Sequence, residues 1–140
     1  MNGISNWFLR IAVVYLIAGV SLGIFMAASQ NHSMAPVHAH LNLLGWVSMG
    51  LFGLFYRVVP RAAETRLAKV HFGIYVPAHF MQMTLLTMLF LGYPEVEPAL
   101  GVASAAVALS ILCFALLVWQ WTAQAKVAAS VREQPRGMAT

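Results

Sequence analysis

Four apolar stretches, each about 20 residues long, limit what this chain can fold into. They run over residues 7–28, 37–59, 70–91 and 99–123. About 20 apolar residues in a helix cross a hydrocarbon core of about 30 Å, so each stretch can span a membrane. Only 9% of the 140 residues are charged and 61% are hydrophobic, which is far from the composition of soluble proteins. The sequence therefore predicts an all-α integral membrane protein, a four-helix bundle over residues 1–131 followed by a disordered cytoplasmic tail over residues 132–140.

Positive charge is confined to alternate connections between these stretches. Arg10 opens the first stretch, four basic residues separate the second from the third, and three follow the fourth. Because cytoplasmic loops carry an excess of lysine and arginine, we expect both termini and the middle loop to be cytoplasmic, as in a bacterial-type inner membrane. Glu95 and Glu97 then face outward. The basic residues serve as topology signals and as contacts to anionic membrane lipids, and nucleic acid is not an expected partner.

A His-Ala-His triplet, His38 to His40, lies at the start of the second stretch. An ionisable side chain inside a membrane span needs a partner and marks a functional site by default. Histidine is also the commonest nitrogen ligand for haem and transition metals. The triplet therefore predicts a bound cofactor, haem b, without covalent attachment because the chain has no Cys-x-x-Cys-His motif.

The depth of each histidine follows from the rise of an α-helix, about 1.5 Å per residue. His38 and His40 fall in the outer leaflet, and His71 falls at the cytoplasmic surface. His79 comes near the midplane, level with about Gly50 and roughly 15 Å below His40. Since both axial ligands of one iron lie at similar depth, a two-fold axis along the membrane normal would supply the second ligand from another subunit. The sequence thus predicts a homodimer with haem near its interface, and leaves His71 and His79 as further ligand candidates.

Several arrangements of the triplet are open at this point. Residues two apart on a helix point about 200° apart, so His38 and His40 should face opposite sides. Either two haems flank the helix, or one histidine binds iron and the other hydrogen-bonds a propionate, a carbonyl or water. A single histidine ligand, a methionine such as Met26 or Met88 as the second ligand, and purely structural polar contacts are alternatives. A non-haem copper or zinc site, or a quinone site, would use His32 together with the triplet.

The triplet and the residues after it resemble a known family. The run His38-Ala39-His40-Leu41-Asn42-Leu43-Leu44-Gly45-Trp46, with Gly50, Gly53, Tyr56 and Pro60, is similar to the tenth transmembrane helix of subunit I of the haem-copper oxidase superfamily. Lys69-Val70-His71-Phe72 resembles the start of that family's next helix. The resemblance implies that His38 corresponds to the ligand of the high-spin, gas-binding haem, and His40 to one ligand of the low-spin, electron-transferring haem. The family has many more spans and a three-histidine copper site, so the resemblance implies a reduced haem-binding unit.

These features predict a small membrane-bound cytochrome that transfers electrons or binds a diatomic gas such as O2 or NO. Two histidine ligands would favour electron transfer, and an open sixth position would favour gas binding. A respiratory electron donor, or a larger oxidase or reductase, is then an expected partner. An alternative is an accessory or assembly subunit, or a haem- or copper-handling protein, of such an enzyme. Whether the protein catalyses a reaction is left open by the sequence.

Overall fold

The computed structural model describes residues 3–133, with side chains up to Ala123. All regular structure in this part of the chain is helical. The elements are α1 (Gly3–Ser29), α2 (Ala35–His40), the π-helix η1 (Leu41–Ser48), α3 (Met49–Val58), α4 (Pro60–Ala63), α5 (Arg66–Phe90), the 3-10 helix η2 (Pro94–Val96) and α6 (Glu97–Glu133). Residues 134–140, which make up most of the predicted tail, lie outside the described residues.

Four helical spans in the described part of the chain are long and apolar enough to cross a membrane. They are Gly3–Ser29, Ala35–Val58, Arg66–Phe90 and Pro94–Ala123. Each coincides, within a few residues at either end, with one apolar stretch of the sequence. Large side chains that face outward are also apolar, for example Val14, Ile24 and Leu116, as expected where lipid surrounds a helix. The prediction of an all-α chain with four helices that are long and apolar enough to span a membrane is confirmed for the described residues.

Helix ends follow local sequence signals. The Thr65 hydroxyl oxygen accepts a hydrogen bond from the Ala68 backbone N–H at 3.1 Å, which caps the start of α5. Pro36 and Pro60 lie in the first turns of α2 and α4. Proline is tolerated there because the backbone N–H that it lacks would have no partner within the helix. Just after α5, Gly92 has a φ of 100°, a conformation that glycine adopts without the Cβ clash of other residues. These signals explain why the chain turns where it does.

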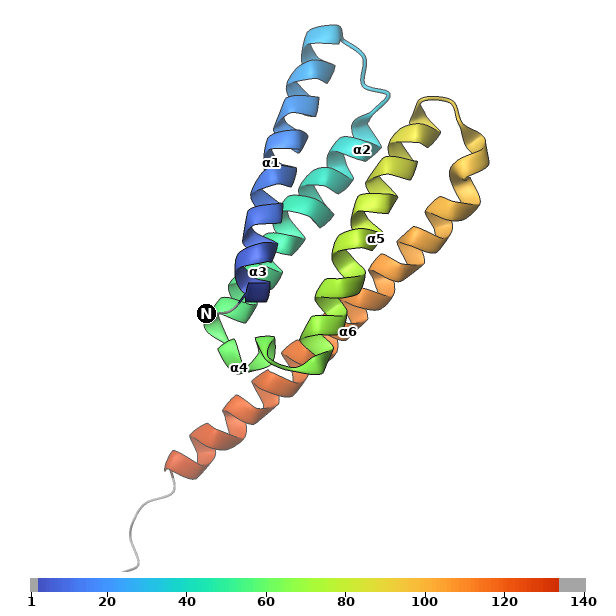
Figure 1. Ribbon diagram of the computed structural model, residues 1–140. Coiled ribbons are helices and arrows are strands. Elements are labelled where there is room, and N and C mark those ends of the chain that lie inside the picture. Colours follow the sequence, from blue (N-terminus) through green and yellow to red (C-terminus); the bar gives the residue numbers. More distant parts are fainter. Residues whose placement is uncertain (1–2, 134–140) are drawn as a thin grey trace, which may run out of the picture.

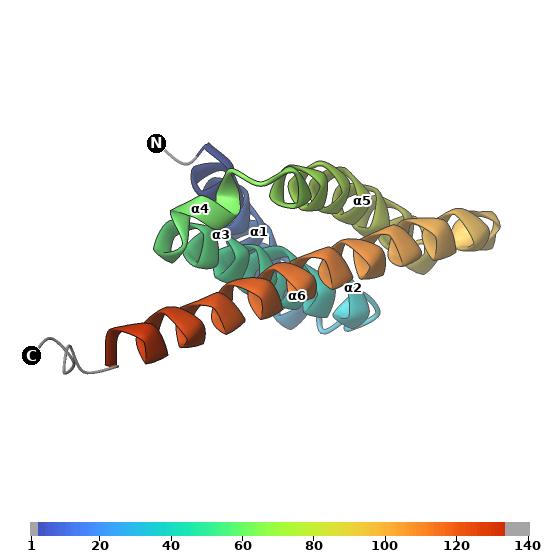
Figure 2. The ribbon, with the colours of Figure 1, turned by 90° about the horizontal axis from the view of Figure 1, so that it is seen from below.

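The spans form two antiparallel hairpins that lie side by side (Figure 1). In the first hairpin α1 packs along η1 and α3, and in the second α5 packs along α6. The first residues of α1 and the last residues of α6 lie at the same end of the bundle, where α4 joins the two hairpins. Figure 2 views the bundle from this end and shows α6 running obliquely across the other helices. We call this end the α4 end, and the opposite end the far end.

An aromatic cluster joins the two hairpins in the half of the bundle near α4. It consists of Phe8, Phe52, Tyr56, Tyr75 and Phe114, together with His71. The ring centroids of Phe52 and Phe114 are 4.4 Å apart, and those of Phe8 and Phe52 are 5.5 Å apart at a near-perpendicular angle. Each such pair contributes about 0.5–1.5 kcal/mol beyond the burial of its area. The cluster therefore holds the hairpins together at this end.

Glycines allow α1 to approach the second span closely. A Cβ on Gly45 would lie 2.6 Å from the ring of Tyr15, and one on Gly53 would lie 2.7 Å from the side chain of Leu9. Ser5 adds a hydrogen bond across the same interface, from its hydroxyl to the carbonyl of Gly53 at 2.9 Å. Close backbone approach of this kind is the usual way in which membrane helices pack, because lipid gives no hydrophobic drive between them.

Part of the second span is π-helical, which the sequence does not predict. Side-chain hydroxyls donate hydrogen bonds to two backbone carbonyls of this segment. The Ser48 hydroxyl donates to the carbonyl of Leu43 at 2.7 Å, and the Tyr75 hydroxyl of α5 donates to the carbonyl of Leu44 at 3.0 Å. A π-helix bonds residues five apart and so rises less per residue than an α-helix. π-helical segments are rare overall, and those that occur are often found at functional sites.

Candidate functional site

His38 is directed at α1. Its Nδ1 lies 2.9 Å from the carbonyl oxygen of Gly19. The ring fits over Gly23, where an added Cβ would lie 2.9 Å from the His38 Cε1. A carbonyl oxygen only accepts hydrogen bonds, so this contact places the proton on Nδ1 and the lone pair on Nε2, and it is shorter than the 3.4 Å contact of the Asn42 amide nitrogen with the same Nδ1. Asn42 steadies the same turn, since its amide nitrogen donates to the backbone carbonyl of His38 at 2.8 Å.

His40 has the same protonation pattern with a different partner. Its Nδ1 lies 2.8 Å from the carbonyl oxygen of Pro36, one turn earlier in its own helix. The lone pair is therefore on Nε2 in this residue as well. Metal-binding histidines almost always donate their second ring N–H to a carbonyl, a carboxylate or water, which fixes the tautomer and the ring angle. Both histidines of the triplet are thus held in the form that can bind a metal.

His79 is completely buried on α5. Its Nδ1 lies 3.2 Å from the side-chain oxygen of Gln82, and the Gln82 amide nitrogen donates to the hydroxyl of Ser104 on α6 at 3.0 Å. An amide oxygen only accepts, so Nδ1 of His79 is protonated and Nε2 holds the lone pair. This buried Nε2 has no hydrogen-bond partner among the described residues. An unpaired buried polar atom is uncommon in proteins and calls for an explanation.

The position of His79 along the bundle differs from the expectation. Its ring centroid is 4.8 Å from that of Tyr15, whose side chain lies directly over Gly45. His79 is therefore nearer to the level of Gly45 than to that of Gly50, and the expected depth is wrong. The expectation set the start of the third span near Val70, whereas α5 begins at Arg66, so that counting from Arg66 and from Val58 at the end of α3 pairs His79 with about Gly45. Helix α2, which carries His40, packs against α5, which carries His79.

His71 lies inside the aromatic cluster. Helix α5 begins at Arg66, so His71 is more than one turn into the span and is fully buried. Its ring centroid is 4.7 Å from Phe52 and 5.3 Å from Phe114, and its Nδ1 lies 2.9 Å from the Tyr56 hydroxyl. Its Nε2 is also buried without a hydrogen-bond partner in the described residues. The backbone carbonyl of His71 accepts a hydrogen bond from the Ser110 hydroxyl on α6 at 2.9 Å.

The structure does not gather a small metal site. His32 is exposed in the connection between α1 and α2. Within residues 3–133, no three histidine, cysteine, aspartate or glutamate side chains come together as ligands for a metal ion. The alternative site of His32, His38 and His40 is therefore not seen as a group in this part of the chain.

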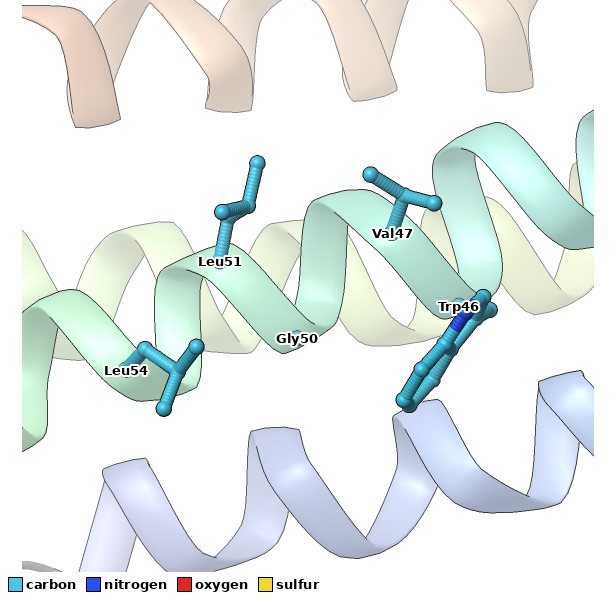
Figure 3. A pocket seen from close by; sticks show the side chains of 5 residues that line it. All are labelled: Trp46, Val47, Gly50, Leu51 and Leu54. Carbon is cyan, nitrogen blue, oxygen red and sulfur yellow. The ribbon is translucent and has the colours of Figure 1, made fainter.

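Two apolar grooves lie on the outside of the bundle. Figure 3 shows the first, of about 210 Å³, where side chains of η1 and α3 surround the bare backbone of Gly50. It is lined by Trp46, Val47, Gly50, Leu51 and Leu54. The second, of about 540 Å³, lies between α5 and α6 and is lined by Pro77, Ala78, Met81, Leu85, Ala99, Val102, Ala103 and Ala106. None of the candidate histidines lines either groove, so the histidine site lies elsewhere, between the helices.

Sequence reasoning missed Gln82 and Ser104 as partners of a candidate ligand. A signal for Gln82 was present, because a polar residue three positions after His79 lies on the same helical face. Ser104 gave no comparable signal, since its contact depends on how α6 packs against α5. The acceptors for the triplet, the carbonyls of Gly19 and Pro36, are backbone groups and leave no trace in the residue types.

No protein-family model, curated protein or solved structure matches this chain.

Proposed function

We propose that this chain is a small membrane protein that binds haem b without covalent attachment and transfers electrons or binds a diatomic gas. One observation carries the proposal. His38, His40 and His79 each direct Nδ1 at an oxygen acceptor, so that each keeps its lone pair on Nε2. Histidine in this form is a standard axial ligand of haem iron. The resemblance of the His38 to Trp46 run to a haem-binding helix supports the same function.

The donor set suits haem. The buried Nε2 of His79 has no partner among the described residues, and the rings of Tyr15 and Tyr75 pack beside the imidazole. When bound, haem b would supply a one-electron couple, or an open coordination position for a gas. The protein would fix the ligand rings through their Nδ1 hydrogen bonds and exclude water through the surrounding helices. Two histidine ligands would make it an electron carrier, and one would make it a gas-binding protein.

The four histidines of the spans would have different roles in this proposal. His38 and His40 follow the resemblance and are the leading ligand candidates, and His79 is the buried candidate on the second hairpin. We assign His71 a structural role, because aromatic rings enclose it and the partner of its Nδ1, the Tyr56 hydroxyl, can donate as well as accept. His71 is therefore a suitable control for variants of the triplet.

We also propose that both termini face the cytoplasm of a bacterial-type inner membrane. Arg57, Arg61 and Lys69 are exposed and lie at or beside the α4 end, where the positive-inside rule places the cytoplasm. The candidate ligands then lie in the half nearer the outer surface, within reach of an electron donor or of a larger oxidase or reductase. A homodimer stays a prediction of the sequence, and the mass of the haem-loaded protein in mild detergent measures it.

The absorption spectrum of the purified protein, together with metal analysis, tests the function. We expect a Soret band and a sharp α-band on reduction, with iron bound in proportion to haem. A folded, colourless protein that takes up no added hemin would contradict the proposal. Bound copper or zinc without the haem spectrum would favour the non-haem alternative.

Variants of two histidines test the site. His40→Ala should abolish or change the haem spectrum, whereas His71→Ala should leave its band positions unchanged. Equal loss in both variants, or no change in either, counts against the assignment of the ligands.

A further inference from the structure

We infer that Gln82 is a positioning residue that holds His79 as an axial ligand of the haem, and that Ser104 anchors Gln82 from α6. This inference rests on the proposed haem-binding function. The haem would then have a ligand from the second hairpin, and Gln82 and Ser104 would set how strongly that ligand binds iron.

The unpaired nitrogen of His79 is the first observation. The side chain is 0% exposed, and its Nε2 has no hydrogen-bond partner in the part of the chain described. A buried polar atom without a partner destabilises a fold, and an apolar residue would fill the same space without that cost. A lone pair kept under these conditions indicates a ligand that binds there.

The direct partner of His79 Nδ1 assigns the lone pair of His79 to the other nitrogen. In the structure the Gln82 amide nitrogen donates to Ser104 Oγ, and the amide oxygen faces His79 Nδ1. His79 must then donate from Nδ1, and Nε2 is the available donor atom for iron. Gln82 is only 6% exposed, so water does not compete for the contact. This arrangement differs from that of His71, whose partner is a hydroxyl that can donate as well as accept.

The surroundings of His79 place it toward the first hairpin. Its ring centroid lies 4.8 Å from that of Tyr15 of α1. Helix α2, which carries the triplet, packs against α5. Among the histidines of α5, His79 is thus the one that approaches the triplet, and one protomer can supply ligands from both hairpins.

Changing the acceptor on Nδ1 should change the haem potential. A stronger acceptor makes Nε2 more basic and favours ferric over ferrous iron, and a missing acceptor does the opposite. Gln82→Glu should therefore shift the midpoint potential of the haem downward, and Gln82→Met should shift it upward. Thr84→Val is the matched control, because Thr84 is exposed on the same helix and its hydroxyl donates to the carbonyl of Phe80 one turn earlier.

Redox titration of the haem-loaded full chain, with electron paramagnetic resonance of the ferric form, measures these effects. We expect opposite shifts for the two Gln82 variants, no shift for Thr84→Val, and a changed iron spin state in His79→Ala that added imidazole reverses. Equal potentials in all Gln82 variants, shifts in the same direction, or an unchanged spin state in His79→Ala would overturn the inference while leaving haem binding intact. A wild-type protein that takes up no haem would overturn the proposed function as well.

Discussion

Replacing Gly53 by alanine should weaken the packing of α1 against α3, whereas the same change at Gly50 should not. A Cβ at position 53 would lie 2.7 Å from Leu9 Cγ and 3.2 Å from the Leu9 backbone nitrogen. The side chain of Leu9 can rotate, but its backbone nitrogen moves only if α1 moves. A Cβ at position 50 meets no described atom within 4 Å. Both glycines belong to α3, so the two substitutions gain the same helix stability, about 0.5–1 kcal/mol.

The size of the effect follows from the contacts at Gly53. Forcing extra volume into a packed interface costs about 1–3 kcal/mol. A shift of α1 would also stretch the 2.9 Å hydrogen bond from Ser5 to the Gly53 carbonyl. Because the gain in helix stability cancels between the variants, the free energy of unfolding of Gly53→Ala should be about 1–3 kcal/mol below that of Gly50→Ala.

Reversible unfolding in mixed micelles, with sodium dodecyl sulfate as the denaturant, measures this difference. Far-ultraviolet circular dichroism reports the loss of helix, and tryptophan fluorescence reports the loss of packing. Equal unfolding free energies for the two variants would refute the close contact between α1 and α3. Lower stability of Gly50→Ala would refute it as well.

Three further results are expected. Ser110→Ala should lower the unfolding free energy by about 0.5–1.5 kcal/mol, since it removes the buried bond to the His71 carbonyl, while Thr122→Ala at an exposed position should change it much less in the same micelle assay. Carbon monoxide should leave the reduced haem spectrum of the wild type unchanged but shift that of His79→Ala, and a shift in both would mean that one axial position is open in the wild type. Tags at the two chain ends should be reached by impermeant reagents only from the cytoplasmic side, and labelling of either end from outside would refute the orientation.

Hydropathy predicts the four spans because the thickness of the hydrocarbon core fixes how many apolar residues each helix needs. The π-helical segment η1 is a different case. Whether a carbonyl bonds four or five residues ahead depends on contacts from elsewhere, and the Leu44 carbonyl accepts the Tyr75 hydroxyl from another helix. Nothing local to Leu44 encodes that contact. The error in the depth of His79 has another origin, since α5 begins at Arg66, four residues before the apolar stretch that starts at Val70.

The candidate ligands could be found from the sequence, but their protonation states could not. His38 and His40 are conspicuous because polar residues are rare in a membrane span. Their tautomers depend on the carbonyls of Gly19 and Pro36, and Gly19 is brought to His38 only by the packing of two helices. The pairing of His71 with the Tyr56 hydroxyl likewise joins two spans. Sequence therefore identifies the residue type of a ligand more readily than its protonation state.

The distribution of aromatic and polar groups favours a position away from the α4 end for the proposed cofactor. Near α4, the rings of Phe8, Phe52 and Phe114 close around His71, and any group inserted there would separate several contacts worth about 0.5–1.5 kcal/mol each. Beyond the cluster, His79 packs against Tyr15 of the first hairpin. Its buried Nε2 has no hydrogen-bond partner among the described residues. Inserting a flat ligand between the hairpins at that level gives up fewer ring contacts and satisfies a buried lone pair. The aromatic cluster can then hold the hairpins together while the far half accommodates the ligand.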